Sequence, residues 1–205
     1  MTSEYETAID SLLSRLIEII ETASQKSEDE LDVELKQAFD ATSRILDAQK
    51  EWKYCKYAMV CWVDSEIIAH YPTWKDNPLE AHYFGKAIAF TEFFKQAQRC
   101  YERHFFNAYE VFFICFMFGF RGVYQPNYKT EIPSSLPTSD AEWQEQTSRR
   151  LAKINRGSDS NWATTKIVDN SDLPLEGFGS FVNNLIIFVC VLVAAIVFYI
   201  ALGTN

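Results

Sequence analysis

Histidine and carboxylate side chains are the first residues to test for chemistry, and their spacing in this chain does not favour it. His70, His82 and His104 stand 12 and 22 residues apart, with no second ligand at helical spacing, so they predict no metal site. Asp64 and Glu66 have the residue types of a general acid and base. Two positions apart on a helix, however, they point about 200° away from each other. We therefore predict no catalytic residue.

Motifs for nucleotide binding and for nucleophilic catalysis do not occur either. The chain contains neither GxxxxGK[ST] nor GxSxG, and Gly177 and Gly179 lack the third glycine of a phosphate loop. These observations predict no cofactor, and they leave an enzyme as a class that only a turnover assay on residues 1–176 would revive. The cysteines are odd in number and form no CxxC pair, which favours reduced, mostly buried thiols. The five are Cys55, Cys61, Cys100, Cys115 and Cys190.

Charge divides the chain into two parts. The 28 acidic and 19 basic residues give a formal net charge of −9, and all of them lie between Met1 and Glu176. This acidic balance argues against nucleic-acid binding, which requires clustered Lys and Arg. Residues 177–205 carry no charge.

The uncharged part contains a predicted membrane span. Residues 185–202 are 18 apolar residues in succession. As a helix they extend about 27 Å, close to the roughly 30 Å hydrocarbon core of a bilayer. A buried core helix is the alternative, but it would normally have a polar face and an element that covers it. We predict a transmembrane tail anchor over residues 181–203.

The N-terminal sequence suggests on which side of the membrane the rest lies. MTSEYETAID has neither the basic nor the apolar region of a signal peptide. We therefore expect residues 1–157 to form a cytoplasmic domain, joined to a single span by a polar linker over residues 158–180. Lys166 is the only base shortly upstream of the span, so the positive-inside rule adds little.

Helical periodicity and capping signals predict that the cytoplasmic domain is all-α, with about six to eight helices. Ser27 and Ser139 begin capping boxes, and Asn107-x-x-Glu110 resembles one. The apolar pattern after Ser27 is too long for one helix, so a break is expected near residues 47–52. Gly85 is expected to close a short helix, with the next helix over 86–103.

Two further segments carry specific expectations. Residues 111–118 are eight apolar residues in a row, too few to span a membrane, and are expected at the centre of a soluble core. The last helix is expected to run from Ser139 to near Gly157, with a basic patch between Arg149 and Arg156. That patch either touches anionic lipid or an acidic partner, or only complements its own helix dipole.

Several short motifs, in this order, resemble the DotU/TssL (IcmH) family, the inner-membrane component of type VI and Dot/Icm type IVB secretion systems. Tyr57-Ala58 to Asp64 resembles the family's "YALxAxxDE" helix, followed by Trp74 in a loop. Pro78-Leu79-Glu80, with Phe84-Gly85 and Thr91 to Phe94, is similar to "PLE…FG…GEEFF". Glu110, Cys115 and the run Gly119-Phe120-Arg121-Gly122-Val123-Tyr124 resemble "E(V/L)…CL…GFxGxY".

The resemblance implies a fold and partners. It implies two packed helical bundles in the cytoplasm, no enzymatic activity, and a place in the bacterial inner membrane. It also implies assembly with an IcmF/TssM-type membrane protein and with baseplate proteins of the contractile tail. The lipid bilayer is expected as a partner from the predicted span, and homodimer formation is left open. Ser65 replaces the Glu of the motif and Gln125 replaces an Arg, so contacts that depend on those residues are in doubt.

The motif residues divide into two groups. Asp64, Glu66 and Arg121 are expected as exposed polar groups that line a partner-binding cleft. The others are expected to be structural, with Gly119 and Gly122 turning the chain and with Phe120 and Tyr124 packing across the turn. The remaining structural members are Tyr57, Ala58, Trp74 and Glu110.

Other classes fit less well. Dot/Icm-type IVB secretion is the nearest alternative. An apoptosis-regulator-like bundle would need an NWGR element, but Asn161-Trp162 continues with Ala163-Thr164. A tethering SNARE would need heptads next to the span, and residues 158–180 contain none. The favoured interpretation is a non-enzymatic scaffold of a type VI secretion membrane complex.

Overall fold

Serine side chains fix where two of the longer helices begin. Ser27 Oγ accepts a hydrogen bond from Glu30 N at 3.3 Å, and the Glu30 carboxylate accepts one from Ser27 N at 2.8 Å. This capping box opens helix α2 (Glu28–Leu46), as predicted. Ser139 Oγ likewise accepts from Glu142 N at 3.2 Å at the start of α7 (Asp140–Trp162).

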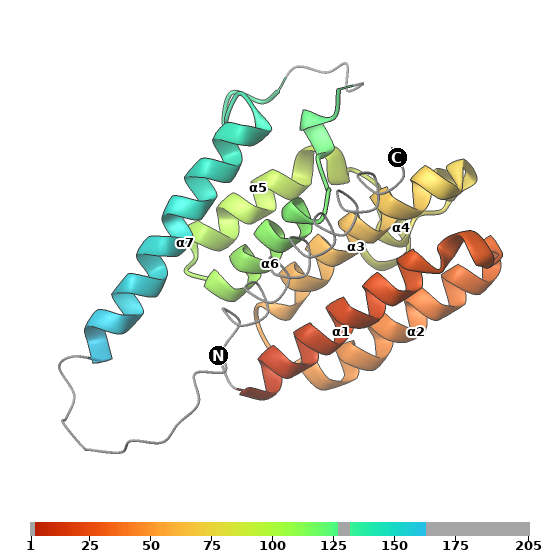
Figure 1. The fold of residues 1–205 in the computed structure, drawn as a ribbon, viewed down its shortest axis with the longest axis horizontal. Helices are drawn as coiled ribbons and strands as arrows, with labels where there is room; N and C mark the ends of the chain where they lie inside the picture. The colour runs from red at the N-terminus through yellow and green to blue at the C-terminus, as the bar shows by residue number, and fades with distance from the viewer. Residues whose placement is uncertain (1–2, 127–131, 163–205) are drawn as a thin grey trace, which may run out of the picture. The chain divides into compact units, whose positions relative to one another are not determined.

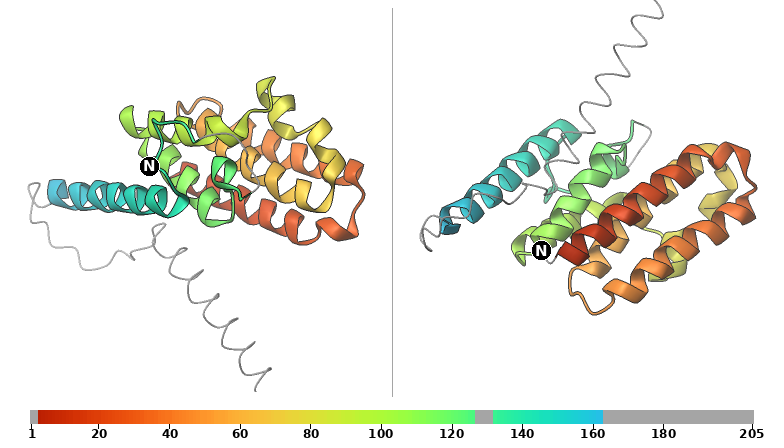
Figure 2. Two further views of the ribbon diagram at one scale, coloured as in Figure 1. Left: turned by 90° about the horizontal axis from the view of Figure 1, so that it is seen from above. Right: turned by 60° about the horizontal axis from the view of Figure 1, so that its bottom comes forward.

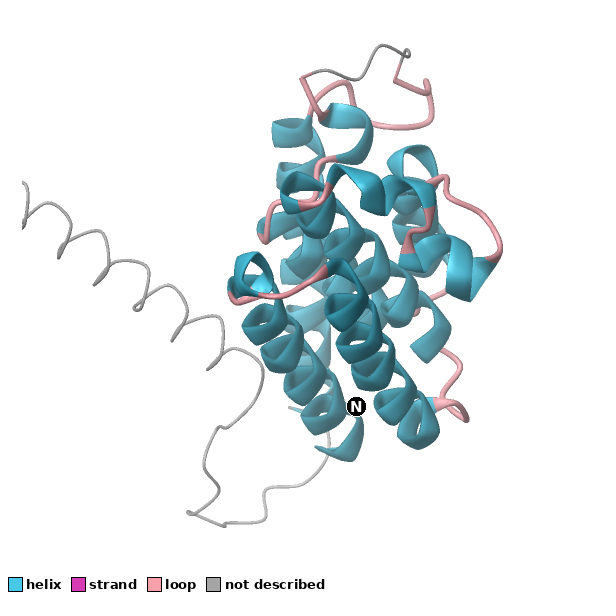
Figure 3. Cartoon of the chain, turned by 90° about the vertical axis from the view of Figure 1, so that its right-hand side faces the viewer, coloured by secondary structure: helices cyan, strands magenta, loops and turns pink. Residues whose placement is uncertain are grey.

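The computed structural model describes residues 3–126 and 132–162. In this part of the chain the regular elements are all helical (Figures 1 and 3). Short 3₁₀ turns follow α1, α3 and α6, at Ala23–Gln25, Pro72–Asp76 and Gly122–Tyr124. The α-helices besides α2 and α7 are α1 (Ser3–Glu21), α3 (Trp52–His70), α4 (Leu79–Phe84), α5 (Ala89–Glu102) and α6 (Phe106–Met117).

Helices α3 and α6 pack against each other at the centre of the unit formed by residues 1–164. The hairpin of α1 and α2 packs on one side of α3, while α5 packs on both central helices and α7 packs on α6 (Figures 1 and 2). These helices belong to one compact unit, and the division into two bundles stays a prediction. The predicted tail anchor lies outside the described residues.

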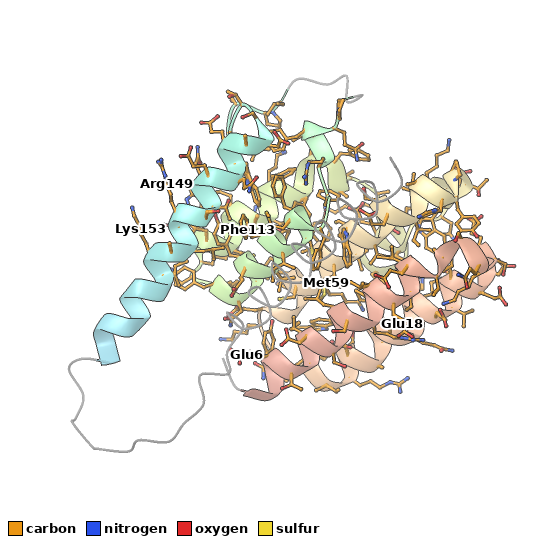
Figure 4. All side chains as sticks on the ribbon, in the orientation of Figure 1. Glu6, Glu18, Met59, Phe113, Arg149 and Lys153 are labelled. Atoms are coloured by element: carbon orange, nitrogen blue, oxygen red, sulfur yellow. The ribbon has the colours of Figure 1, made fainter. Side chains whose placement is uncertain are left out.

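Aromatic side chains fill the interior between α5, α6 and α7. The rings of Phe93 and Phe120 are 4.2 Å apart, and Trp143 of α7 lies 4.7 Å from Phe116 and 5.1 Å from Phe94. Met59, on the central helix α3, is fully buried (Figure 4). Since apolar burial is the main stabilising contribution, these contacts hold α7 against the rest of the unit.

One segment among the described residues, Phe106–Tyr124, is long and apolar enough to cross a membrane by length and composition. Of its most apolar window, 56% is buried inside the protein. Core helices of soluble proteins pass the same test, and α6 packs against α3, α5 and α7. Most of residues 111–118 are buried or half-buried, as expected of a core segment, but Met117 is 52% exposed.

The other boundary predictions have mixed outcomes. The break near residues 47–52 is confirmed, and Gly85 ends α4 in the left-handed conformation at φ 71°. The capping box at Asn107 is wrong, because α6 begins one residue earlier, at Phe106. Helix α7 runs on to Trp162 instead of ending near Gly157. Four cysteines are buried free thiols, as expected, and Cys190 lies outside the described residues.

Candidate functional site

Asp64 is a buried carboxylate that joins three segments of the chain. It lies on α3, is 5% exposed, and accepts hydrogen bonds from Trp74 Nε1 at 2.7 Å, Leu79 N at 2.9 Å and Glu80 N at 2.8 Å. The two backbone groups are at the start of α4, where helix N–H groups have no partner within the helix. Asp64 therefore caps α4 from α3. Burial raises its pKa to about 6, although the three hydrogen bonds act in the opposite direction.

Glu80 plays the same part for the next helix. It is 3% exposed and accepts hydrogen bonds from Tyr57 Oη at 3.0 Å, Ile88 N at 3.1 Å and Ala89 N at 3.0 Å. The last two groups open α5, whose own N-cap residue, Ile88, has no side chain that can cap it. Glu80 thus connects α3, α4 and α5.

Glu51 caps α6 from the start of α3. Its carboxylate accepts from Ala108 N at 3.0 Å and from Asn107 Nδ2 at 3.2 Å. This contact explains why the predicted Asn107 cap does not form. Glu51 takes the place of that cap, because its carboxylate accepts from the Ala108 N–H and also holds the Asn107 amide.

A cleft of about 260 Å³ lies beside the first two of these carboxylates. Its lining combines polar and apolar side chains from α3, from the loops on either side of α4, and from the turn after α6. The volume is below the roughly 300–1,000 Å³ of typical small-molecule pockets. Lining residues include Asp64, Ser65, Lys75, Glu80, Phe90 and Gln125.

The three polar residues predicted to line a common cleft have separate surroundings. Asp64 reaches the cleft but is almost fully buried, so the expectation that it is exposed is wrong. Its carboxylate is held by hydrogen bonds that stabilise α4. Glu66 is half-buried on another face of α3, where its Oε1 would lie 3.2 Å from a Cβ placed on Gly119. Burial raises the pKa of Glu66.

Arg121 closes the C-terminal end of α6. Its Nη1 donates to Phe116 O at 2.6 Å and to Phe120 O at 3.2 Å, and its guanidinium lies 4.5 Å from the centre of the Phe116 ring. Its Nε also lies 3.7 Å from Asp140 Oδ2 of α7. A cation at this position complements the helix dipole. Partner binding by Glu66 and Arg121 stays a prediction.

The glycine-aromatic motif is structural. Gly119 and Gly122 have φ values of 116° and 48°. A Cβ on Gly122 would lie 2.9 Å from Phe90 O, so only glycine fits there without movement. Tyr124 packs its ring 4.8 Å from that of Phe94 and donates to Pro137 O at 2.9 Å. Phe120 packs on Phe93, so both aromatic residues cross the turn as predicted.

The other expected structural residues are also in packed positions. Ala58 and Trp74 are buried in the core, and Tyr57 donates to Glu80. Glu110 is the least enclosed of them. It is half-buried, and burial, together with the negative charges of Glu6 and Asp10 on α1, raises its pKa.

Sequence reasoning missed Glu51 and Glu80 as capping residues. Glu80 lies within the motif segment Pro78-Leu79-Glu80, which could have indicated its role. No local signal marks Glu51, because the backbone N–H that it accepts from lies 57 residues further along the chain. Among the described residues, no three His, Cys, Asp or Glu side chains are grouped so that they could hold a metal ion.

Comparison with known proteins was made against family profiles, curated proteins and solved structures. The family profile described as type VI secretion system protein DotU matches residues 5–204. The chain belongs to the DotU family. The curated proteins and the solved structures gave no significant match.

Membership in the DotU family makes the chain a structural component of a type VI secretion system, associated with the inner membrane. The match extends over α1 to α7, so it covers the cleft and all three capping carboxylates. The cleft is therefore part of the DotU domain and not of an added segment.

Proposed function

We propose that this DotU protein is a non-enzymatic scaffold of a bacterial type VI secretion membrane complex. In this proposal residues 181–203 anchor it in the inner membrane, and the helical domain faces the cytoplasm. There it binds an IcmF/TssM-type membrane protein and docks baseplate proteins of the contractile tail. The family match over residues 5–204 supports this assignment.

We place partner docking at the cleft. The observation that supports this is that two carboxylates at the bottom of the cleft are held in fixed positions. Asp64 and Glu80 are each held by three hydrogen bonds from other segments, so the cleft keeps its shape before a partner arrives. Lys75 is exposed at the cleft, and Phe90 is 43% exposed there. An apolar ring beside a cation suits a partner segment with an aromatic or aliphatic anchor and an acidic neighbour.

Site-specific photo-crosslinking in the native host tests this docking site. A photoreactive amino acid replaces Lys75 at the cleft or, as a control, the exposed Arg44 on α2. We expect crosslinks from position 75 to a secretion-system protein, and none from position 44 to that protein. Ala87 also lines the cleft, and filling the cleft by Ala87→Phe should lower the crosslink yield roughly five- to tenfold. Equal crosslinking from both positions would contradict docking at the cleft.

A further inference from the structure

One face of helix α7 packs against the core, and another face points away from it. Trp143 and Thr147 are buried against the unit, and Arg150 is engaged there too, donating to Gln98 Oε1 at 2.7 Å and lying 4.4 Å from the Tyr101 ring centre. Arg149 and Lys153, four residues apart, point away from the core (Figure 4). The Arg149 side chain is 73% exposed, although it forms an ion pair with Glu145.

Charge is distributed unevenly between the two sides of this unit. The segment from Arg149 to Arg156 has four basic residues and no acidic one, whereas α1 and α2 with their connection, residues 3–46, have 11 acidic and four basic residues. The α1–α2 hairpin and α7 lie on opposite sides of α3 and α6 (Figures 1 and 2). Helix α7 as a whole is balanced, since Asp140, Glu142, Glu145 and Asp159 match its four basic residues. Its positive charge is confined to the stretch from Arg149 to Arg156, whereas the hairpin is acidic along its length.

We propose that the outward face of α7, marked by Arg149 and Lys153, lies on the anionic headgroups of the cytoplasmic leaflet, with the α1–α2 hairpin turned away from the membrane. This inference rests on the proposed anchoring by residues 181–203. The 18 residues 163–180 between α7 and that segment can span about 60 Å at most, a tether long enough for α7 to reach the surface. Anionic lipids give the cytoplasmic leaflet a negative potential.

Two features favour a lipid surface over an acidic protein as the occupant. Arg149 and Lys153 are long side chains on an open helix face, which suits a diffuse layer of phosphates better than a partner that requires a shaped pocket. The same negative surface repels the acidic hairpin, so one field both attracts α7 and orients the whole unit. A protein partner at α7 would not by itself set this orientation.

The test uses the full chain reconstituted in vesicles of phosphatidylcholine, alone or mixed with phosphatidylglycerol. A fluorescent donor is attached at Ala152→Cys on the outward face of α7 or at Val33→Cys on α2, both exposed positions. The four native cysteines in the described part are buried, and Cys190 is replaced by serine, so that the label attaches at the introduced position. Energy transfer to headgroup-labelled lipid measures how close each face lies to the membrane.

We expect transfer from position 152 to exceed that from position 33, to rise with phosphatidylglycerol, and to weaken at high salt. One basic side chain changes the equilibrium constant for binding an anionic surface about fivefold. Reversing both charges in Arg149→Glu/Lys153→Glu should therefore lower the equilibrium constant for docking of α7 at least about 25-fold. The control Arg44→Glu/Lys86→Glu changes the net charge equally at exposed sites away from α7, and should preserve the transfer from position 152.

Three results would overturn the proposal. The first is equal energy transfer from both labels, and the second is transfer that does not change with phosphatidylglycerol. The third is transfer that appears only after Asp169, Asp172 and Glu176 are neutralised, which would mean that the acidic linker, and not lipid, covers the outward face of α7. Flotation with pure phosphatidylcholine tests anchoring separately. If the chain floats only with vesicles that contain phosphatidylglycerol, and position 152 stays close to lipid, the proposed anchor is contradicted and lipid binding by α7 is supported. If the chain floats with neither kind of vesicle, both proposals are contradicted.

Discussion

Glu51, Asp64 and Glu80 each accept hydrogen bonds from the first backbone N–H groups of a different helix. The three helices they cap have Phe105, Pro78 and Ile88 at their own N-caps, none of which caps through its side chain. A carboxylate is also favourable beside the positive end of the helix dipole. At the scale of single residues, acidic groups thus connect helices, and two of them form the floor of the cleft.

Asp64→Asn tests the capping role. The amide nitrogen of asparagine would face one of the three donors around Asp64, leaving a buried donor without an acceptor, so we expect a loss of roughly 2–4 kcal/mol in the free energy of unfolding. Urea denaturation measures it. Asp76→Asn, at an exposed position, should change stability by less than about 0.5 kcal/mol. Equal stability of the two variants would mean that Asp64 does not hold α4.

The pH dependence of stability offers a second test of Asp64. Its folded-state pKa of about 6 lies above that of an unfolded aspartate, about 3.9, so the folded state binds more protons between these values. The contribution of Asp64 to the free energy of unfolding therefore falls as the pH rises from about 4 to about 6, by at most about 3 kcal/mol. The measurement compares wild type with Asp64→Asn, which cannot titrate. A difference that stays flat or grows with pH would contradict the raised pKa.

At the scale of elements, the sequence correctly predicted those helix boundaries that depend on local contacts. The box at Ser27, the break after Leu46 and the close of α4 at Gly85 depend on residues within one turn of each other. The start of α6 could not be predicted this way, because Glu51 competes for Asn107 from a distant part of the chain. The exposure expected for Asp64 failed for the same reason, since its partners include Trp74 and the start of α4.

Gly122→Ala tests the turn after α6. A methyl group there would meet Phe90 O at 2.9 Å, and the backbone φ of 48° is unfavourable for alanine. We expect a destabilisation of about 2–4 kcal/mol, measured by urea or thermal denaturation. Gly85→Ala is a matched control. It also has a positive φ, but no atom lies within 4 Å of the added methyl group, so only about 1 kcal/mol should be lost.

Glu80→Gln tests the link between α4 and α5. The glutamine amide would face at least one of the donors Tyr57 Oη, Ile88 N and Ala89 N, which weakens the cap of α5. We expect the amides of Ile88 and Ala89 to exchange with deuterium about tenfold faster or more. Glu102→Gln, exposed at the other end of α5, should not alter their exchange. Unchanged protection in the Glu80 variant would show that the cap is dispensable.

At the scale of the whole molecule, the uneven charge and the order of short motifs were visible in the sequence. They pointed to the DotU family, which the match over residues 5–204 confirms. The cleft was not predictable in detail, because it depends on how α3, the loops beside α4 and the turn after α6 pack together. Nor was the opposition of the acidic hairpin and the basic face of α7, which requires the tertiary arrangement.

The central claim is that this DotU protein is a scaffold of a type VI secretion membrane complex, and affinity isolation of the tagged full chain tests it most directly. The chain is solubilised from membranes of its native host in mild detergent, and co-isolated proteins are identified by mass spectrometry. We predict recovery of a large IcmF/TssM-type inner-membrane protein together with baseplate proteins. Isolation of the intact chain without any such partner would contradict the proposed function.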